Sequence, residues 1–383
     1  MSITPQTLHW EENGEAKSAL WRSEAGVAPA KRVILADDQT KADEAWRLAC
    51  EGMALLWCGD FQNARQLLQA MARRIDKKPA KKKHAASMTE AFHQHRMAQA
   101  QRARTLGMLL VPLNADYSVP LRRAPEVCEA CSEAYGPPNV DTPTSVVSLR
   151  ELQGLIGAHE WRKKGVPIPA LGDNIHPHYG VFSPVRGEYI DLVAAAPLPA
   201  ALQKNSLAFD IGTGTGVLAA LLAKRGIAHV VATDQDPRAL ACAGDNIGRL
   251  GLGQQVAVIA ADLFPEGTAP LIVCNPPWVP AKPSSPIENA VYDPDSRMLR
   301  GFLAGLKEHL SPGGEGWLIL SDFAEHLGLR TRAELLTLFE KGGLRLIQRH
   351  DIRPRHAKAA DITDPLHLAR VAEQTSLWRL AAA

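Results

Sequence analysis

The stretch Asp210-Ile211-Gly212-Thr213-Gly214-Thr215-Gly216 follows the apolar residues 207–209 and passes directly into the helix-forming residues 217–222. A strand, a glycine-rich turn and a helix in this order predict a ligand at the helix N-terminus, because glycines let it approach the backbone closely. The spacing is Gly-x-Gly-x-Gly after an acid, whereas dinucleotide folds would need a further glycine at Val217. An ordinary tight turn can contain the same letters, so the prediction needs support from the rest of the chain.

From Leu207 onward, short apolar runs rich in β-forming residues alternate with segments of helical spacing. Strands are expected at residues 207–212, 229–234, 256–262, 270–275, 316–322, 344–351 and 376–382. Helices are expected after Gly216, after Pro237 and across residues 296–310. This alternation predicts an α/β fold with a seven-stranded parallel sheet.

Two further acids stand where a nucleoside cofactor needs them, since open parallel sheets bind ligands outside the carboxyl ends of their strands. Asp234 closes the second expected strand and Asp262 closes the third. The first carboxylate can accept hydrogen bonds from both ribose hydroxyls, and the second can accept one from an adenine amino group. Either acid alone is equally compatible with a helix cap or a solvated turn.

The most specific motif is Asn275-Pro276-Pro277-Trp278, directly after the fourth expected strand. Successive prolines stiffen the turn and leave its carbonyls as acceptors. An amino group donates two hydrogen bonds, so the Asn275 side-chain oxygen and the Pro276 carbonyl can hold both hydrogens and aim the nitrogen lone pair. Trp278 offers a flat face for a base or an amide. These four residues are the candidate catalytic set.

The chain from about residue 177 onward resembles the amino-methyltransferase branch of class I S-adenosylmethionine-dependent methyltransferases. Members share an Asp-x-Gly-x-Gly-x-Gly loop and an (Asn/Asp/Ser)-Pro-Pro-aromatic loop, and they include release-factor glutamine, ribosomal-RNA guanine amino and DNA adenine methyltransferases. The matching residues are Asp210, Gly212, Gly214, Gly216, Asp234, Asp262 and 275–278. The resemblance implies a Rossmann-like fold, S-adenosyl-L-methionine as cofactor, and direct in-line methyl transfer to a planar nitrogen without a metal.

Residues 179–184 and 188–193 are more loosely similar to the segment that covers the cofactor in that branch. Phe182 in this segment and Leu263 after Asp262 complete the expected cofactor-binding residues. Trp278 departs from the Tyr or Phe that is commoner at its position. A tryptophan still permits stacking, but the departure leaves the substrate open.

A chain of 383 residues exceeds the usual size of one domain. We expect residues 1–160 to form a mainly helical accessory region for substrate recognition, and residues 161–383 to form the catalytic domain. Apolar residues recur at helical spacing over 41–75, with a break at Gly59-Asp60, and a third helix is expected over 88–110. A helix starting near Asp60 fits, because aspartate is a favoured N-cap. We recognise no known family in residues 1–160.

The charge of the chain is uneven, although its net value is only +2. Between Gln62 and Pro125 there are thirteen Lys or Arg residues and three acids. Such a concentration predicts contact with a polyanion, here RNA or a ribosomal substrate, through the basic segment 65–123. A solvated helical face, or an exposed linker at the lysine-rich residues 77–83, is the alternative.

Several functional classes are disfavoured. No apolar run approaches the length of about 18 residues that a membrane span needs, and the first residues lack the features of a secretory signal. The six scattered cysteines are expected to be reduced thiols in a cytoplasmic protein. Cys128-x-x-Cys131 lacks a second pair of metal ligands at suitable spacing, so no metal site is expected.

Three functions remain open at this point. The first is methylation of an exocyclic amino group of a nucleic-acid base, with RNA favoured over DNA, and the second is methylation of a glutamine side-chain amide in a protein. The third is a binding module without catalysis, which the complete set of motif residues disfavours. The basic segment favours the first over the second.

Overall fold

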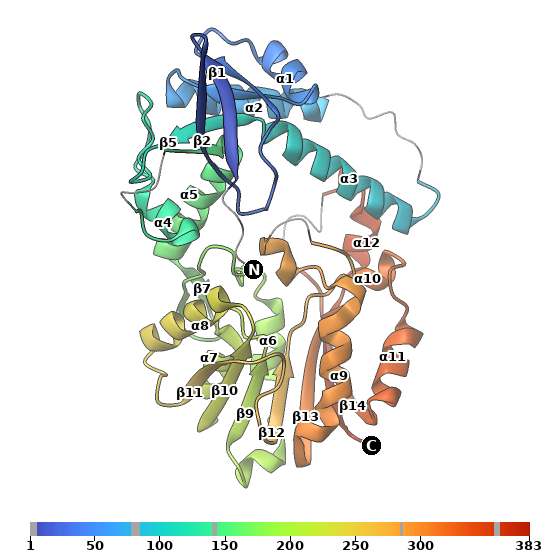
Figure 1. Ribbon diagram of the computed structural model, residues 1–383. Helices are drawn as coiled ribbons and strands as arrows, with labels where there is room; N and C mark the ends of the chain where they lie inside the picture. Colours follow the sequence, from blue (N-terminus) through green and yellow to red (C-terminus); the bar gives the residue numbers. More distant parts are fainter. Residues whose placement is uncertain (1–5, 78–84, 140–143, 284–285, 356–360) are drawn as a thin grey trace. The chain divides into compact units, whose positions relative to one another are not determined.

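The computed structural model describes residues 6–77, 85–139, 144–283, 286–355 and 361–383. They form two compact units, shown in Figure 1. The N-terminal unit comprises the described residues up to Ala85 together with His93–Glu160, and the C-terminal unit comprises Ala86–Phe92 and the described residues from Trp161 onward. The division falls inside two helices, α3 and α5.

The N-terminal unit contains a six-stranded mixed sheet in the order β1-β2-β6-β5-β4-β3. Its strands are β1 (Thr7–Glu12), β2 (Glu15–Arg22), β3 (Arg32–Ala36), β4 (Met53–Trp57), β5 (Leu109–Leu113) and β6 (Ser145–Ser148). Its helices are α1 (Ala42–Cys50), α2 (Phe61–Lys77), α3 (Met88–Leu106), α4 (Cys128–Tyr135) and α5 (Leu149–Lys164). The strands β3, β4 and β5 are parallel neighbours, and β6 is antiparallel to β5.

The expectation of a mainly helical N-terminal region is therefore wrong. Four of the five residues of β4 are buried, and a short continuous apolar run cannot be distinguished from a buried helical turn by its periodicity. The third expected helix is correct up to Leu106, after which Leu109 and Leu110 belong to β5. The helix expected near Asp60 is confirmed, because the Asp60 carboxylate accepts a 2.9 Å hydrogen bond from the Gln62 backbone N–H at the start of α2.

The seven strands expected in the C-terminal half are confirmed, and they form one sheet in the order β11-β10-β9-β12-β13-β15-β14. They are β9 (Leu207–Ile211), β10 (His229–Asp234), β11 (Val256–Ala260), β12 (Ala269–Cys274), β13 (Leu310–Ser321), β14 (Leu344–Ile352) and β15 (Thr375–Ala382). The pairs from β11 to β13 are parallel, as expected, but β15 runs antiparallel to both β13 and β14, so the sheet is not parallel throughout. A small hairpin, β7 (Val166–Ile168) and β8 (Asp173–Ile175), precedes the sheet.

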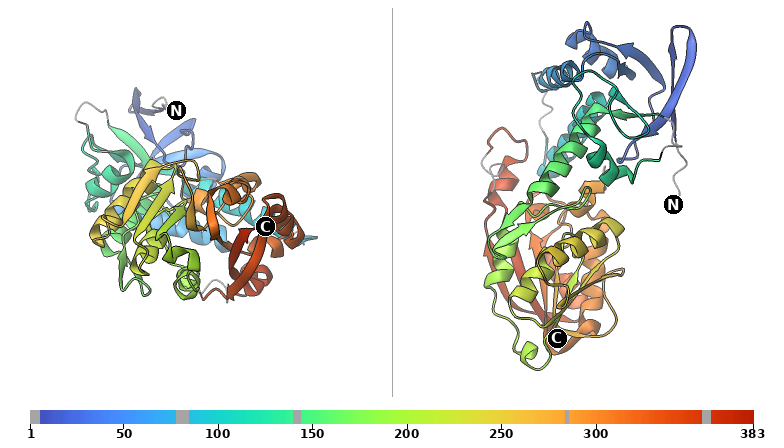
Figure 2. Two further views of the ribbon diagram at one scale, coloured as in Figure 1. Left: turned by 90° about the horizontal axis from the view of Figure 1, so that it is seen from below. Right: turned by 90° about the vertical axis from the view of Figure 1, so that its left-hand side faces the viewer.

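Helices cover both faces of this sheet (Figures 1 and 2). The unit contains α6 (Glu188–Ala195), α7 (Val217–Lys224), α8 (Pro237–Arg249), α9 (Arg297–His309), α10 (Phe323–His326), α11 (Arg332–Lys341) and α12 (His367–Ala372), with 3₁₀ turns η1 (Ala200–Gln203), η2 (Pro286–Ala290) and η3 (Pro294–Ser296). The helices expected after Gly216, after Pro237 and near residues 296–310 are thus confirmed. No helix in the described part of the chain is both long and apolar enough to cross a membrane.

The sheet core has two sides because alternate strand residues point to opposite faces. Leu271 and Val273 of β12 pack in the apolar cluster that contains α6 and α7, and Ile272 and Cys274 pack in the cluster that contains α9. Strand register then aligns the loops at the carboxyl edge. Ile211 is the partner of both Thr233 and Cys274, so the next residues along the chain, Gly212, Asp234 and Asn275, leave the sheet at the same level.

Candidate active site

The glycine-rich loop between β9 and α7 has a left-handed backbone at each of its three glycines, with φ of +70° at Gly212, +56° at Gly214 and +80° at Gly216. A Cβ on Gly212 would collide with the Met298 methyl group, and one on Gly216 would lie 3.2 Å from the Ala243 backbone. A Cβ on Gly214 would meet nothing within 4 Å. The left-handed backbone therefore favours glycine at all three positions, Gly216 also packs closely against the Ala243 backbone, and Gly214 borders open space that a ligand can use.

The side chain of Asp210 stabilises the glycine-rich loop through two hydrogen bonds. Its side chain is buried, and its Oδ2 accepts a 2.7 Å hydrogen bond from the Thr213 hydroxyl and a 3.0 Å hydrogen bond from the Ala219 backbone N–H. Ala219 is in the first turn of α7, whose N-cap is Gly216 and provides no side chain. Asp210 thus supplies the cap from the preceding strand, and burial raises the pKa of its carboxyl to about 6.

The raised pKa of Asp210 predicts a pH effect on stability. Burial raises the pKa of this carboxyl to about 6, whereas an aspartate in the unfolded chain has a pKa of 3.8, so between these values the folded state binds the extra proton and its stability falls as pH rises. Asp210→Asn is expected to remove this decline, which corresponds to about 3 kcal/mol. The test is to measure the free energy of unfolding in urea for wild type and Asp210→Asn from pH 3.5 to 7. If this free energy changes with pH in the same way in both proteins, the prediction is wrong.

Asp234 lies beside the glycine loop, as the register requires. Its Oδ2 accepts a 3.0 Å hydrogen bond from the Gly214 backbone N–H, and its Oδ1 accepts one of 3.0 Å from Asp236. Burial raises the pKa of this carboxyl. Each oxygen retains acceptor capacity for a further donor, such as a ribose hydroxyl. Asp236 caps α8 by accepting from the Arg238 backbone N–H at 2.9 Å.

Thr233 connects three loops of the site and was not among the residues predicted from the sequence. Its carbonyl accepts a 2.8 Å hydrogen bond from the Thr213 N–H, and its fully buried hydroxyl donates a 2.6 Å hydrogen bond to the Leu263 carbonyl. Leu263 has a φ of +75°, a backbone conformation that costs a non-glycine residue about 1–3 kcal/mol. The sequence feature that could have identified Thr233 is a hydroxyl side chain at a position expected to be buried in an apolar strand.

Asp262 lies on the surface after β11. Its side chain is 65% exposed and pairs with Arg297 at the start of α9, with 3.0 Å between Oδ2 and the guanidinium nitrogen. An exposed pair of this kind contributes little to stability, so a ligand donor can displace the arginine. The role of Asp262 as an adenine acceptor stays a prediction.

The Asn275–Trp278 loop follows β12 directly. Pro276 is buried, while Asn275, Pro277 and Trp278 are half-buried. The Trp278 indole Nε1–H donates a 2.9 Å hydrogen bond to the Asn275 side-chain oxygen. The indole ring packs against apolar residues from both faces of the sheet, so it is held in place.

The chain after this loop is fixed beside it. Val279 and Tyr292 form an isolated β-bridge, and the Asp293 N–H donates a 2.9 Å hydrogen bond to the Val279 carbonyl. The Asp293 carboxylate accepts hydrogen bonds from the Met298 and Leu299 N–H groups and so caps α9. Asp293 therefore has a structural role, and burial raises its pKa.

The segment before α6 is anchored to α8 through two histidines. The His176 N–H donates to the Asn246 Oδ1 at 2.8 Å, and the His178 Nε2 lies 2.9 Å from the Asp245 Oδ2. Phe182, an expected cofactor-binding residue, is half-buried in this segment. In the same segment, Ser183 Oγ is a buried atom without a hydrogen-bond partner among the described residues.

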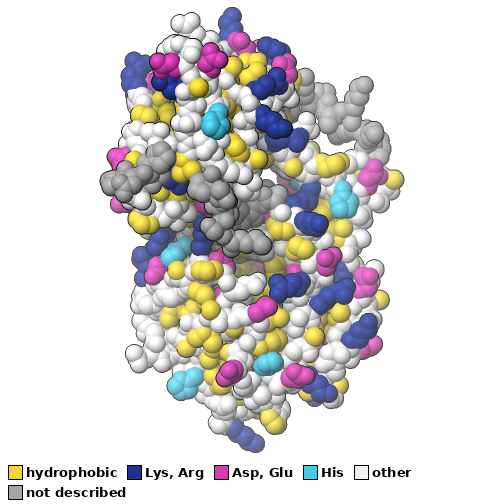
Figure 3. Space-filling view, viewed as in Figure 1, with side chains coloured by type: hydrophobic (Ala, Val, Ile, Leu, Met, Phe, Trp, Pro, Cys, Tyr) yellow, Lys and Arg dark blue, Asp and Glu magenta, His cyan; other side chains and the backbone are white. Residues whose placement is uncertain are grey.

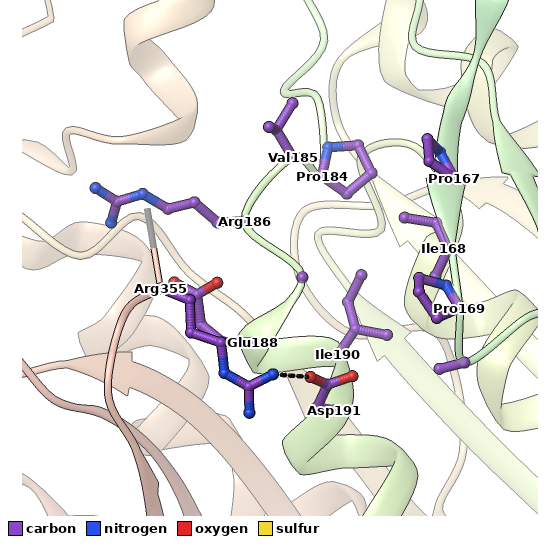
Figure 4. A pocket seen from close by; sticks show the side chains of 12 residues that line it. Pro167, Ile168, Pro169, Pro184, Val185, Arg186, Glu188, Ile190, Asp191 and Arg355 are labelled. Carbon is purple, nitrogen blue, oxygen red and sulfur yellow. Dashed lines mark ion pairs between the residues drawn. The ribbon is translucent and has the colours of Figure 1, made fainter. Parts of the chain in front are cut away.

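A cavity of about 260 Å³ lies next to the start of α6 (Figure 4). Its walls come from residues 167–170, residues 184–188, Ile190, Asp191 and Arg355, and Arg355 pairs with Asp191 at 3.7 Å. The Glu188 Oε1 is buried without a hydrogen-bond partner among the described residues. The cavity contains none of the residues of the glycine loop or of the Asn275–Trp278 loop, so it is separate from the place where the motifs meet.

Comparisons with known proteins find a match to a protein family in the C-terminal unit. Residues 173–342 match the family model of the methyltransferase small domain. The chain is 41% identical over 111 residues to a release factor glutamine methyltransferase of Cereibacter sphaeroides, covering 28% of this chain and 36% of that protein. It is 29% identical over 157 residues to a tRNA1(Val) (adenine(37)-N6)-methyltransferase of Bacteroides fragilis, covering 37% of this chain and 66% of that protein.

A third relative is a ribosomal protein L11 methyltransferase of Symbiobacterium thermophilum, 44% identical over 71 residues, which cover 18% of this chain and 23% of that protein. The chain thus spans less than two thirds of the length of each of these relatives. The three differ in the substrate that their names state, while all are methyltransferases.

Proposed function

We propose that this protein, whose residues 173–342 form an S-adenosylmethionine-dependent methyltransferase domain of the methyltransferase small domain family, methylates an exocyclic amino group of a base in RNA. Its cofactor is S-adenosyl-L-methionine, bound by the loops that follow β9, β10 and β11. The observation that carries the proposal is the shared register of Ile211, Thr233 and Cys274, which brings Asn275 next to the glycine loop and Asp234.

The proposed reaction needs few groups from the protein. The substrate amino group donates one hydrogen bond to Asn275 Oδ1 and one to the Pro276 carbonyl, so its lone pair is directed at the methyl carbon. When bound by these loops, S-adenosyl-L-methionine would supply the methyl group: the substrate nitrogen would gain a bond to the methyl carbon, that carbon would lose its bond to sulfur, and the nitrogen would release a proton to water. The positively charged sulfonium makes the methyl group reactive, so an oriented nucleophile in a desolvated site is sufficient.

The basic segment 65–123 and the similarity to a tRNA methyltransferase support RNA as the substrate. Ion pairs within the structure, however, reduce the positive charge that the basic segment 65–123 can offer to RNA. Arg74 pairs with Asp43, Arg102 with Asp76, and both Arg122 and Arg123 with Asp60. On the face of the N-terminal unit in Figure 3, basic side chains lie among acidic ones. The lysines at 78 and 81–83 lie outside the described residues.

The second candidate is methylation of a glutamine side-chain amide in a protein. The similarity to a release factor glutamine methyltransferase favours it, and a planar primary amide can donate the same two hydrogen bonds. The experiment that separates the candidates uses a strain of the source organism from which the gene is deleted. Its lysate is incubated with the purified protein and radiolabelled S-adenosylmethionine, then divided into RNA, DNA and protein. Label in RNA supports the first proposal, label in protein alone supports the second, and no label refutes both.

The lysine-rich residues provide a test of the RNA partner. Neutralising Lys77, Lys78, Lys81, Lys82 and Lys83 to glutamine is expected to weaken binding of total RNA and to flatten its salt dependence, by roughly 0.7 to 0.9 logarithmic units per lost phosphate contact. Turnover at saturating RNA should persist, because these residues lie far along the chain from Asn275. The measurement is affinity for total RNA from low to physiological salt. Identical slopes for the two proteins would make the protein amide the leading candidate.

A further inference from the structure

The hydrogen bond between Trp278 and Asn275 joins the last and first residues of the candidate catalytic loop. The donor is the indole Nε1–H, the acceptor is the Asn275 Oδ1, and the distance is 2.9 Å. Among aromatic side chains, phenylalanine has no donor, and the tyrosine hydroxyl is at the far end of its ring. The bond therefore depends on the one feature in which Trp278 departs from the commoner Tyr or Phe.

This bond decides which end of the Asn275 carboxamide faces the indole. A carboxamide carries an acceptor oxygen at one end and a donor NH₂ at the other, and a half-turn of its last torsion exchanges them. An indole N–H can only donate, so the flipped carboxamide would place two donors against each other. The oxygen keeps a second lone pair, which remains free to accept from another group.

The indole itself cannot easily move away. The ring packs against the apolar cluster with α7, the cluster with α9, and a third cluster containing Phe323 and Leu327. Turning it would leave those contacts unfilled, at a cost in packing energy. Because the apolar core holds the Trp278 ring, the indole N–H has a fixed position relative to the Asn275 side chain.

We propose that Trp278 is a positioning residue that holds the Asn275 carboxamide with its oxygen toward the reacting amino group. The inference rests on the proposed function, because it assigns to Asn275 Oδ1 the acceptor role described above. A free carboxamide would spend part of its time with its NH₂ group facing the substrate NH₂, and that arrangement repels the nucleophile. Trp278 removes this unproductive state before substrate arrives, which is a form of preorganisation.

The first test is Trp278→Phe, which keeps a flat apolar ring and removes the donor. The probe is total RNA from the deletion strain with radiolabelled S-adenosylmethionine. Turnover is expected to fall about tenfold, equivalent to about 1.4 kcal/mol, with the apparent KM for RNA and the cofactor affinity within about twofold of wild type. Wild-type turnover in Trp278→Phe would overturn the inference, because stacking alone would then be enough.

The second test repeats the substitution in Asn275→Asp. Both carboxylate oxygens are acceptors, so no orientation has to be imposed, and the loss caused by Trp278→Phe is expected to shrink below about twofold. An equal loss in both backgrounds would mean that the indole acts through general packing, and the inference would be wrong. The matched control is Trp317→Phe, which removes a buried indole hydrogen bond to Glu315 in β13 and is expected to lower the unfolding temperature but not turnover.

A third measurement does not depend on activity. The Trp278 indole N–H signal in ¹⁵N-labelled protein is identified by its loss in Trp278→Phe. In Asn275→Ala this signal should shift and exchange faster with solvent, and an unchanged signal would overturn the inference. The proposed function and the positioning role can be distinguished. If Asn275→Ala keeps full turnover, the proposed function is wrong. If Asn275→Ala is inactive but Trp278→Phe is fully active, only the positioning role of Trp278 is wrong.

Discussion

Asn275→Ala is expected to lower turnover at least ~100-fold while leaving the affinity for S-adenosylmethionine within about twofold of wild type. The substitution removes the side-chain oxygen that orients the reacting nitrogen, and that contact matters most in the transition state. It leaves the glycine loop and Asp234 unchanged, since the hydrogen bond of the Asn275 side chain is with Trp278 and not with them. Single-turnover methyl transfer measures the first quantity and titration calorimetry measures the second.

The matched control is Asn275→Asp, which retains an acceptor at the same place and should keep a substantial part of the turnover. Full turnover in Asn275→Ala would mean that residues 275–278 form only a turn. A parallel loss of cofactor affinity would point instead to a disordered loop. The two measurements therefore distinguish a chemical role of Asn275 from a structural one.

Asp234→Ala is expected to abolish measurable binding of S-adenosylmethionine. A carboxylate that accepts from both ribose hydroxyls makes two charge-assisted hydrogen bonds, each of about 1.5–3 kcal/mol, so the affinity should fall at least ~100-fold. The loss is increased because the Gly214 N–H also loses its acceptor, 3.0 Å away, which leaves the hydrogen bond from the Thr213 N–H to the Thr233 carbonyl as the remaining link between the glycine loop and β10. Titration calorimetry with the purified protein measures the effect.

Asp236→Ala is a close control for this prediction. Asp236 is two residues away and caps α8 through the Arg238 N–H, so its removal should cost about 0.5–2 kcal/mol of stability and leave cofactor affinity intact. Gly214→Val should reproduce the loss seen in Asp234→Ala, because a β-branched residue cannot adopt a φ of +56° without strain and its side chain would enter the ligand's space. Unchanged affinity in both Asp234→Ala and Gly214→Val would show that the cofactor binds elsewhere.

The C-terminal sheet could be predicted from the sequence because its strands are short apolar runs, and most of them are separated from the next by a helical segment. The N-terminal unit also alternates strands with helices from β3 onward, but its strands could not be predicted because their apolar runs are too short to be told from helical turns by periodicity. Residues 53–57 form a short, wholly apolar run between α1 and α2, whose residues have true helical spacing, so the pattern predicts a helix across this run as well. Only the pairing of β4 with β3 and β5 identifies it as a strand.

The candidate site shows a similar limit. The positions of the glycine loop, Asp234 and Asn275 follow from motif spacing along the chain. The role of Thr233 does not, because it depends on strand register and on the direction of one hydroxyl. Charge was also overestimated from the sequence, since a count over residues 62–125 omits Asp43 and Asp60, which pair with arginines inside that range. Ion pairs join residues distant along the chain, and a sequence window does not include their partners.

The order β13-β15-β14 at one side of the C-terminal sheet has a consequence for synthesis on the ribosome. β15 lies between β13 and β14, yet it is translated after both of them, so β14 has no place in the sheet until the residues of β15 have emerged. Until then β14 and one edge of β13 present unpaired backbone N–H and C=O groups, and an edge of this kind can pair with another chain. The nascent protein is therefore exposed to aggregation in the interval between the emergence of β14 and that of β15.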